Sequence, residues 1–158
     1  MITDKYVFFW GGTCSQWAPS KFEIDNITYN CAEQYMMAKK ALLFKDKEAH
    51  EKIMESKSPK EQKAIGRKVK GFDTKTWEKV CREYVYEANL AKFTQNKEML
   101  KELKSYGDRE IVEASPVDKI WGIGLHPSDA KVHDKKNWRG KNWLGEAIMR
   151  VKNELNKK

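Results

Sequence analysis

The strongest constraint on the fold of this chain is a change in hydrophobic periodicity after residue 30. From Cys31 to Phe44, apolar side chains recur at positions that share one face of a helix. Ser58-Pro59-Lys60-Glu61 is a strong helix start, because Ser58 can cap and Pro59 suits the first turn. That helix is predicted to end near Lys70-Gly71. The same reasoning predicts further helices at 47–54, from Asp73 or Thr74 to about 91, at 96–106 and at about 144–155.

The first 30 residues have the composition of strands. Lys5–Trp10 is a β-branched and aromatic run that ends at Gly11-Gly12, and apolar residues between 22 and 29 alternate around Asp25-Asn26, a plausible hairpin turn. A further short strand is predicted at 110–114, before a loop over about 115–141. The sequence therefore predicts one α+β domain over residues 1–158. It is predominantly helical, with a small β component near the N-terminus and around residues 110–114.

Composition excludes several protein classes. Hydrophobic residues make up 40% of the 158 residues, and only four prolines and nine glycines occur, which excludes collagen-like and disordered chains. No run approaches the ~18 apolar residues of a membrane span. The three cysteines lie at wide spacings that form no disulfide framework and no zinc motif. We therefore expect a cytoplasmic protein that binds no membrane, no metal and no cofactor.

The net charge of +8 favours a phosphorylated ligand. One group of basic residues is interleaved with Trp138 and Trp143, which suits nucleic acid but also a mobile surface loop. A second group recurs at helical spacing, where it binds phosphate or forms a solvated helix face. The first group comprises Lys131, Lys135, Lys136, Arg139 and Lys141, and the second comprises Lys60, Lys63, Arg67 and Lys70.

Two stretches carry residues suited to catalysis. The loop from Glu113 to Gly124 holds two carboxylates, a tryptophan that could stack on a base, and glycines that let backbone amides approach a phosphate. The alternative is a buried tryptophan beside a turn. On the helix that begins near Cys31, Glu33 and Lys40 are seven residues apart and therefore lie on nearly the same face. The alternatives are a dipole-stabilising Glu33 and ordinary surface lysines.

An ordered set of motifs closely resembles the NADAR, or YbiA-like, family over nearly the whole chain. Any one motif alone is weak, whereas the set in this order is specific. The motifs are Phe8-Phe9-Trp10, Ser15-Gln16-Trp17, Cys31-Ala-Glu-Gln-Tyr-Met-Met-Ala-Lys-Lys-Ala, Gly66-Arg67, Trp77, Ala88-Asn89-Leu90-Ala91-Lys92-Phe93, Gln95-Asn96, Glu113-Ala-Ser-Pro, Asp118, Ile120-Trp121-Gly122-Ile-Gly and Gly140-Lys-Asn-Trp-Leu-Gly145. The stretch 125–137 has no clear family pattern, and substrate choice is expected to differ there.

The resemblance implies an enzyme that hydrolyses N-glycosides, cutting a ribose from a nitrogen of a nucleobase-like ring. Two substrate classes are associated with the family. One is the ribosylamino-pyrimidine phosphates of early riboflavin biosynthesis, and the other is ADP-ribose attached to guanine in nucleic acid. The high positive charge leads us to expect the nucleic-acid substrate, with contacts through Lys131, Lys135, Lys136 and Arg139.

The resemblance also implies the site. Lys40 is the expected nucleophile, Glu33 or Asp118 moves protons, and Glu113 binds ribose hydroxyls. Trp121 stacks on the base, and Arg67 and Lys92 bind phosphate. The expected substrate-binding residues are Trp121, Gly122, Arg67, Lys92, Trp10, Ser15 and Asn142. The alternative is a module that binds ADP-ribose or nucleic acid without turnover, whereas a purely structural interaction protein explains neither the loop nor the acid–lysine pair.

Overall fold

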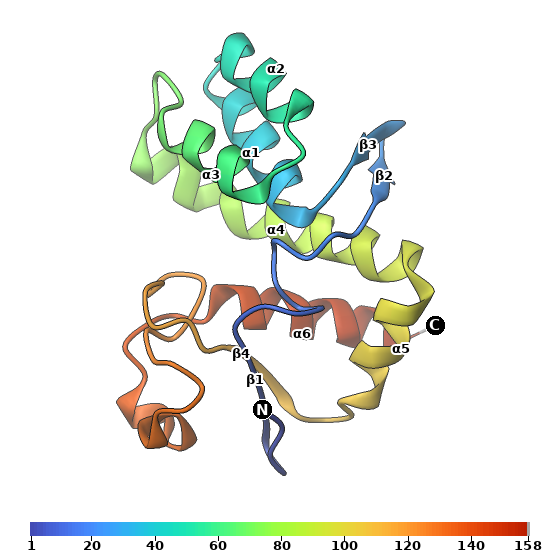
Figure 1. Ribbon diagram of the computed structural model, residues 1–158, viewed down its shortest axis with the longest axis vertical. Coiled ribbons are helices and arrows are strands. Elements are labelled where there is room, and N and C mark those ends of the chain that lie inside the picture. Colours follow the sequence, from blue (N-terminus) through green and yellow to red (C-terminus); the bar gives the residue numbers. More distant parts are fainter. Residues whose placement is uncertain (158) are drawn as a thin grey trace. The chain divides into compact units, whose positions relative to one another are not determined.

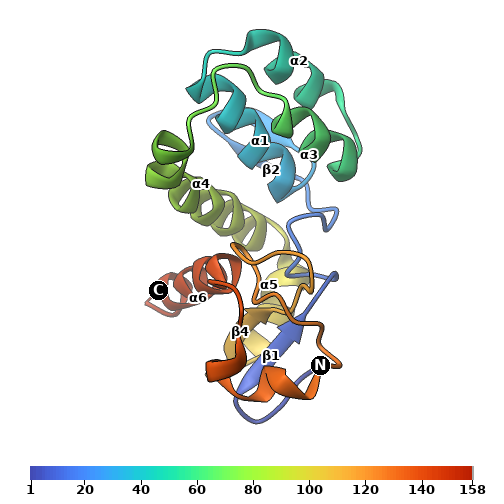
Figure 2. The same cartoon turned by 90° about the vertical axis from the view of Figure 1, so that its left-hand side faces the viewer.

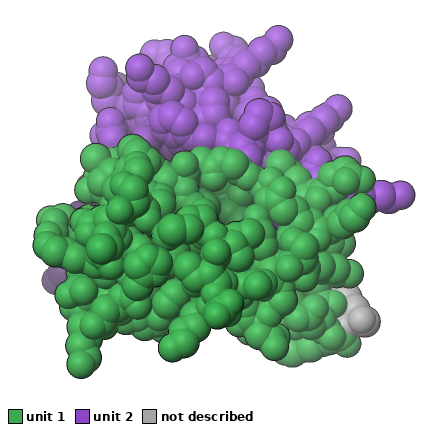
Figure 3. Space-filling view, turned by 60° about the horizontal axis from the view of Figure 1, so that its bottom comes forward, with its two compact units in different colours: residues 1–15, 98–158 green, residues 16–97 purple. Residues whose placement is uncertain are grey.

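Six α-helices, four short strands and two 3₁₀ helices occur among residues 1–157, which the computed structural model describes (Figure 1). This confirms the predicted α+β class with a predominance of helix. The chain divides into two compact units, coloured separately in Figure 3. Unit 1 contains residues 1–15 and the chain from Glu98 onward, and unit 2 contains residues 16–97.

Unit 2 opens with the predicted hairpin. Strand β2 (Phe22–Ile24) pairs antiparallel with β3 (Ile27–Tyr29). The two turn residues, Asp25 and Asn26, have positive φ angles of 52° and 66°. Asn and Asp tolerate this left-handed backbone, which gives a tight turn the twist of the strands it joins. The prediction of a turn at these residues is confirmed.

Helix α1 (Ala32–Leu43) is central to unit 2 and contacts three other helices, as Figures 1 and 2 show. Its partners are α2 (Lys47–Glu55), α3 (Pro59–Arg67) and α4 (Thr74–Gln95). Each partner begins after a residue whose side chain accepts a hydrogen bond from a backbone N–H of the first turn. These N-caps are Asp46, Ser58 and Asp73.

Unit 1 contains the other sheet. Strand β1 (Tyr6–Phe9) pairs in parallel with β4 (Glu110–Glu113), and α6 (Trp143–Asn156) contacts β4. Helix α5 (Lys97–Ser105) runs from the boundary between the units to the turn before β4. A buried cluster fills this unit, consisting of Phe8, Val112, Ala114, Ile123, Leu125 and Val132.

The structure differs from the predicted elements in three places. Helix α4 continues to Gln95, beyond the predicted end near residue 91. Helix α3 ends at Arg67, before the expected Lys70-Gly71, because the N–H of Lys68 turns to the carbonyl oxygens of the last helical turn. The predicted loop at 115–141 also holds two 3₁₀ helices, Ala130–His133 and Lys135–Asn137. Aspartate side chains at 129 and 134 cap both of them. None of the helices formed by residues 1–157 is long and apolar enough to cross a membrane.

Candidate active site

The backbone at the start of α1 places Glu33 in the first helical turn. Cys31 is the N-cap residue, with an extended backbone and no side-chain hydrogen bond to the helix. The backbone N–H of Glu33 donates instead to the carbonyl oxygen of Gln16, at 3.0 Å. One of the four open N–H groups of the helix is thereby satisfied from an earlier segment. The Glu33 residue is only 4% exposed.

Lys40 lies two turns further along α1, against two aromatic rings. Its Nζ is 4.5 Å from the ring centre of Phe72 and 5.7 Å from that of Trp77. Both distances are within the range of cation–π attraction. Phe72 stands just before α4 and remains 43% exposed, and Trp77 lies in the first turns of α4. The lysine side chain is therefore held between α1 and the start of α4.

Burial lowers the pKa of Lys40, because a desolvated ammonium is less stable than a hydrated one. The negative charge of Glu33 opposes this by raising the pKa, and the positive charge of Arg67 lowers it further. The net direction is downward. The structure thus brings the predicted residues Glu33 and Arg67 within electrostatic range of Lys40, and it increases the fraction of Lys40 that can act as a nucleophile at neutral pH.

Lys92, the fourth predicted residue of unit 2, is completely buried on α4. Burial raises the pKa of the Cys31 thiol, the charge of Glu33 raises it further, and the positive charge of Lys92 acts in the opposite direction. Lys92 and Glu33 therefore both act on the beginning of α1. Burial of this kind suits a lysine that balances an acidic group more than one that meets solvent. Phosphate binding by Lys92 stays a prediction.

The loop of unit 1 that carries Asp118 and Trp121 is a turn built on short side-chain hydrogen bonds. The hydroxyl of Ser115 accepts from the N–H of Asp118 at 3.1 Å. One carboxylate oxygen of Asp118 accepts from the N–H groups of Ile120 and Trp121, each at 2.9 Å. The Trp121 ring meets that of Trp143 edge-on, with centres 5.7 Å apart. Asp118 therefore shapes the turn that presents Trp121.

Asn142 holds strand β4 with both ends of its amide. Its Oδ1 accepts from the N–H of Glu113 at 2.9 Å, and its Nδ2 donates to the carbonyl of Ile111 at 3.0 Å. The residue is 3% exposed and has a positive φ of 55°. Asn142 thus positions the backbone of the predicted catalytic residue Glu113. A direct contact of Asn142 with substrate stays a prediction.

Gly122 is required by packing within unit 1. A Cβ atom at this position would lie 2.8 Å from the carbonyl oxygen of Glu113 and 3.0 Å from that of Asp118. The first distance is shorter than real Cβ contacts and the second is at their tight end, so a larger residue requires the backbone of the loop to shift. Glycine here lets the two ends of the loop approach each other. The predicted contact of Gly122 with a phosphate stays a prediction.

The remaining predicted residues of unit 1 are placed as follows. Trp10 is 52% exposed, and the centre of its ring is 5.5 Å from that of His126. The backbone N–H of Ser15 donates to the carbonyl oxygen of Gly12. In the predicted nucleic-acid cluster, Lys135 forms an ion pair with Glu110. The other three members, Lys131, Lys136 and Arg139, are exposed.

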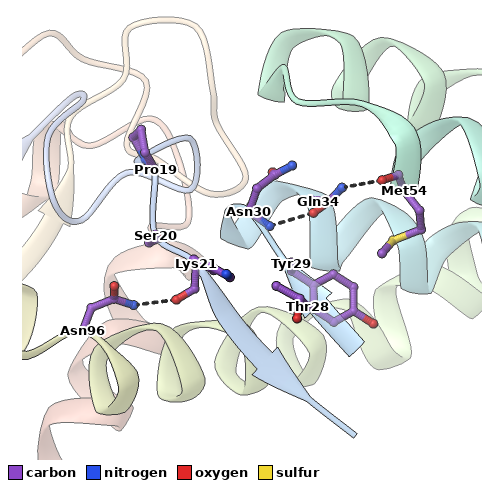
Figure 4. A pocket seen from close by; sticks show the side chains of 9 residues that line it. All are labelled: Pro19, Ser20, Lys21, Thr28, Tyr29, Asn30, Gln34, Met54 and Asn96. Carbon is purple, nitrogen blue, oxygen red and sulfur yellow. Dashed lines mark hydrogen bonds between the residues drawn. The ribbon is translucent and has the colours of Figure 1, made fainter. Parts of the chain in front are cut away.

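A pocket of about 500 Å³ in unit 2 contains none of the predicted residues (Figure 4). Much of the polarity of its wall is already used in hydrogen bonds. The Gln34 amide accepts from the N–H of Asn30 and donates to the Met54 carbonyl, and the Asn96 amide donates to the Lys21 carbonyl. These bonds fasten the hairpin to α1, α2 and the end of α4. The pocket therefore offers little for ligand recognition.

Three residues next to the predicted ones were missed by sequence reasoning. Phe72 and Trp77 contact Lys40 although they are more than 30 residues away in the sequence. Gln16 contacts Glu33 although 17 positions separate them. Trp77 and Gln16 do occur in the family-like motifs, and those motifs could have identified them as residues near the site. No motif contains Phe72, and nothing in its local sequence indicates a contact with Lys40.

The turn role of Asp118 gives a first testable prediction. Asp118→Asn retains an oxygen that accepts from the Ile120 and Trp121 N–H groups, whereas Asp118→Ala removes it. If Asp118 also moves protons, Asp118→Asn should lower turnover by on the order of 10²-fold while thermal stability stays near that of the wild type. Asp118→Ala should lower both. Full turnover in Asp118→Asn would restrict Asp118 to its turn role.

Comparison with known proteins connects this arrangement to a family. The family model described as "NADAR domain" matches residues 8–156. The chain is 43% identical to N-glycosidase R617 of Acanthamoeba polyphaga mimivirus, over 98% of both chains. It is 37% identical to Protein irg-1 of Caenorhabditis elegans, over 97% of this chain and 81% of that protein.

The fold agrees with a solved structure. The NMR structure of the Escherichia coli protein YbiA superposes with a TM-score of 0.80 at 26% identity, over 99% of this chain and 88% of that one. The E. coli protein is named N-glycosidase YbiA. Sequence and structure therefore agree on one relationship: the chain belongs to the NADAR domain family.

Proposed function

We propose that this protein is an N-glycosidase that hydrolyses the bond between a ribose and a nitrogen of a nucleobase-like ring, with Lys40 as the nucleophile. The observation that carries the proposal is the environment of Lys40. Burial lowers the pKa of this lysine, and the rings of Phe72 and Trp77 hold its side chain. The names of the viral and bacterial relatives support the reaction class.

The proposed reaction begins with attack of the neutral Lys40 amine on C1 of the ribose. The new Nζ–C1 bond forms as the C1–N bond to the base breaks, and the departing nitrogen takes the bonding electrons and a proton. Ring opening then breaks the C1–O4 bond, O4 takes a proton, and Lys40 becomes an imine. Water adds to C1 and releases the lysine, so that the sum of the steps is hydrolysis. Glu33 or Asp118 carries the protons in this scheme.

The family resemblance assigns the other roles. Glu113 binds ribose hydroxyls, Trp121 stacks on the base, and Arg67 binds phosphate. Incubation with a ribosylamino-pyrimidine phosphate and with DNA carrying ADP-ribosylated guanine tests the proposal. We expect release of ribose phosphate or of ADP-ribose. Binding of both substrates without any cleavage would instead establish the alternative, a non-catalytic binding module.

The charges around Lys40 predict the pH dependence. Because only the neutral amine attacks, kcat/KM should rise with pH as Lys40 loses its proton. Arg67 lowers the pKa of Lys40, so Arg67→Gln should move this rise to higher pH. The neighbouring exposed residue provides the control, since Lys68→Gln should leave the profile unchanged. A profile of Arg67→Gln that is lower at every pH but not displaced would mean that Arg67 acts only in binding.

ADP-ribosylated nucleic acid is the proposed substrate class, and the exposed cations of unit 1 support it. Each phosphate contact should give a slope of log affinity against log salt of roughly −0.9 on duplex and about −0.7 on single strands. Joint replacement of Lys131, Lys135 and Lys136 by Ala should flatten the slope for modified DNA and leave the small phosphate substrate unaffected. Lys135 should contribute least, because Glu110 already pairs with it. Equal, salt-insensitive activity on DNA before and after would favour the small metabolite.

A further inference from the structure

Gln16 and Asn89 form a buried amide pair in unit 2 that has no role in the scheme above. The Nδ2 group of Asn89 donates to the Oε1 of Gln16 at 2.8 Å and to the carbonyl of Val85 at 2.8 Å. Asn89 lies on α4 and is completely buried, and Gln16 is half-buried. The backbone carbonyl oxygen of Gln16 accepts a hydrogen bond from the backbone N–H of Glu33, so the pair lies beside the start of α1.

The orientation of both amides is determined by the helix. The Val85 carbonyl can only accept a hydrogen bond, so Asn89 must direct its NH₂ group there. That NH₂ group is also the one that meets Gln16, so Gln16 must present its oxygen. Turning either amide over would place two oxygens or two NH₂ groups against each other. The remaining atoms of the pair are therefore a donor, Gln16 Nε2, and an acceptor, Asn89 Oδ1.

These two remaining atoms are buried and have no hydrogen-bond partner among the described residues. Burial of an unpartnered donor and acceptor is unfavourable, and native proteins keep few such groups without a reason. A donor and an acceptor together suit a ligand with two hydroxyl groups, since one hydroxyl accepts from Nε2 and the other donates to Oδ1. Vicinal hydroxyls of this kind occur on ribose.

We infer that Gln16 Nε2 binds the 2-hydroxyl group and Asn89 Oδ1 the 3-hydroxyl group of the substrate ribose, in addition to the bond proposed for Glu113. This inference rests on the proposed function, which supplies the ribose. Because Gln16 is half-buried and Asn89 fully buried, the sugar reaches the pair from the Gln16 side. The amide pair then selects ribose over 2-deoxyribose, and it holds the sugar by the same segment whose carbonyl positions Glu33.

The test compares binding of ribose 5-phosphate and 2-deoxyribose 5-phosphate by calorimetry. Both sugars carry an aldehyde and a phosphate, so contributions from Lys40 and Arg67 are the same in the wild type and in the Gln16 variants and cancel when their affinity ratios are compared. The wild type should prefer ribose 5-phosphate roughly tenfold, which corresponds to about 1.4 kcal/mol. In Gln16→Met and in Gln16→Leu, which both remove the donor Nε2, the ratio should fall to about one.

Gln95 provides a matched control in the same unit. Its amide accepts from the N–H of Glu23 and donates to the Glu23 carbonyl, so both ends are already used. Gln95→Met should therefore leave the tenfold ratio unchanged. An unchanged ratio in the Gln16 variants, no preference in the wild type, or no binding of ribose 5-phosphate would each overturn the inference. If a buried water, and not the sugar, is the partner of both amides, the ratio will be unchanged in the Gln16 variants. Since the readout is binding of a free sugar phosphate and not cleavage, absent cleavage would contradict the proposed function and leave this ratio measurable.

Discussion

Lys40→Ala is expected to lose turnover by on the order of 10³-fold or more while it still binds ligand. The reason is that the variant removes the attacking amine, whereas the groups assigned to the base, ribose and phosphate remain. Single-turnover rates on a cleavable substrate and product affinities measured on the same preparation would separate the two effects. A binding module would instead show only a change of affinity.

The adjacent lysine provides the control for this experiment. Lys39 lies on the same helix with its Nζ 5.5 Å from the ring centre of Tyr35, so it also combines an ammonium with an aromatic ring. Lys39→Ala should keep turnover within about twofold, because a single cation–π contact of this kind is weak. Lys40→Arg should be as inactive as Lys40→Ala, since guanidinium stays protonated. Equal losses in the Lys39 and Lys40 variants would contradict a specific role for Lys40.

The largest loss of stability is expected from Asn142→Ala, at about 2–4 kcal/mol of unfolding free energy. The variant removes both hydrogen bonds to β4 and places alanine at a positive φ. Denaturant unfolding followed by fluorescence measures this loss. Asn142→Gly removes the same bonds but tolerates the backbone, so it should be more stable than Asn142→Ala by about 1 kcal/mol.

An exposed asparagine gives the comparison. Asn137 donates a single hydrogen bond of 3.3 Å to the Lys131 carbonyl. Asn137→Ala should therefore change stability by less than about 0.5 kcal/mol. If Asn142→Ala were as stable as Asn137→Ala, the fastening of β4 to the start of α6 would contribute little, and the placement of Glu113 would need another explanation.

Local chemistry explains which parts of the fold were predictable. Ser58 and Asp73 accept hydrogen bonds from the first turns of α3 and α4, and Asp25-Asn26 adopts the left-handed turn expected between two short strands. These features depend on neighbours within four residues, so a single sequence contains them. The parallel pairing of β1 with β4 joins residues about 100 positions apart, and no local pattern specifies it.

The same distinction applies to the site. The spacing of Glu33 and Lys40 placed both on α1, because helical geometry alone relates them. The contact of Lys40 with Phe72 depends on how the start of α4 packs against α1, and the bonds from Asn142 to β4 depend on tertiary structure in unit 1. Sequence reasoning assigned Asn142 to substrate binding, which stays a prediction, and it missed the bonds of the Asn142 amide to the β4 backbone. Tertiary packing decides such roles.

Reductive trapping tests the central claim most directly. Sodium borohydride added during turnover reduces an imine to a stable secondary amine and leaves the sugar attached to the protein. We expect an adduct with the mass of the reduced sugar, and peptide mapping should locate it on Lys40, with none on Lys39. Cleavage of the substrate without any trapped adduct, or with an adduct on another lysine, would contradict Lys40 as the nucleophile.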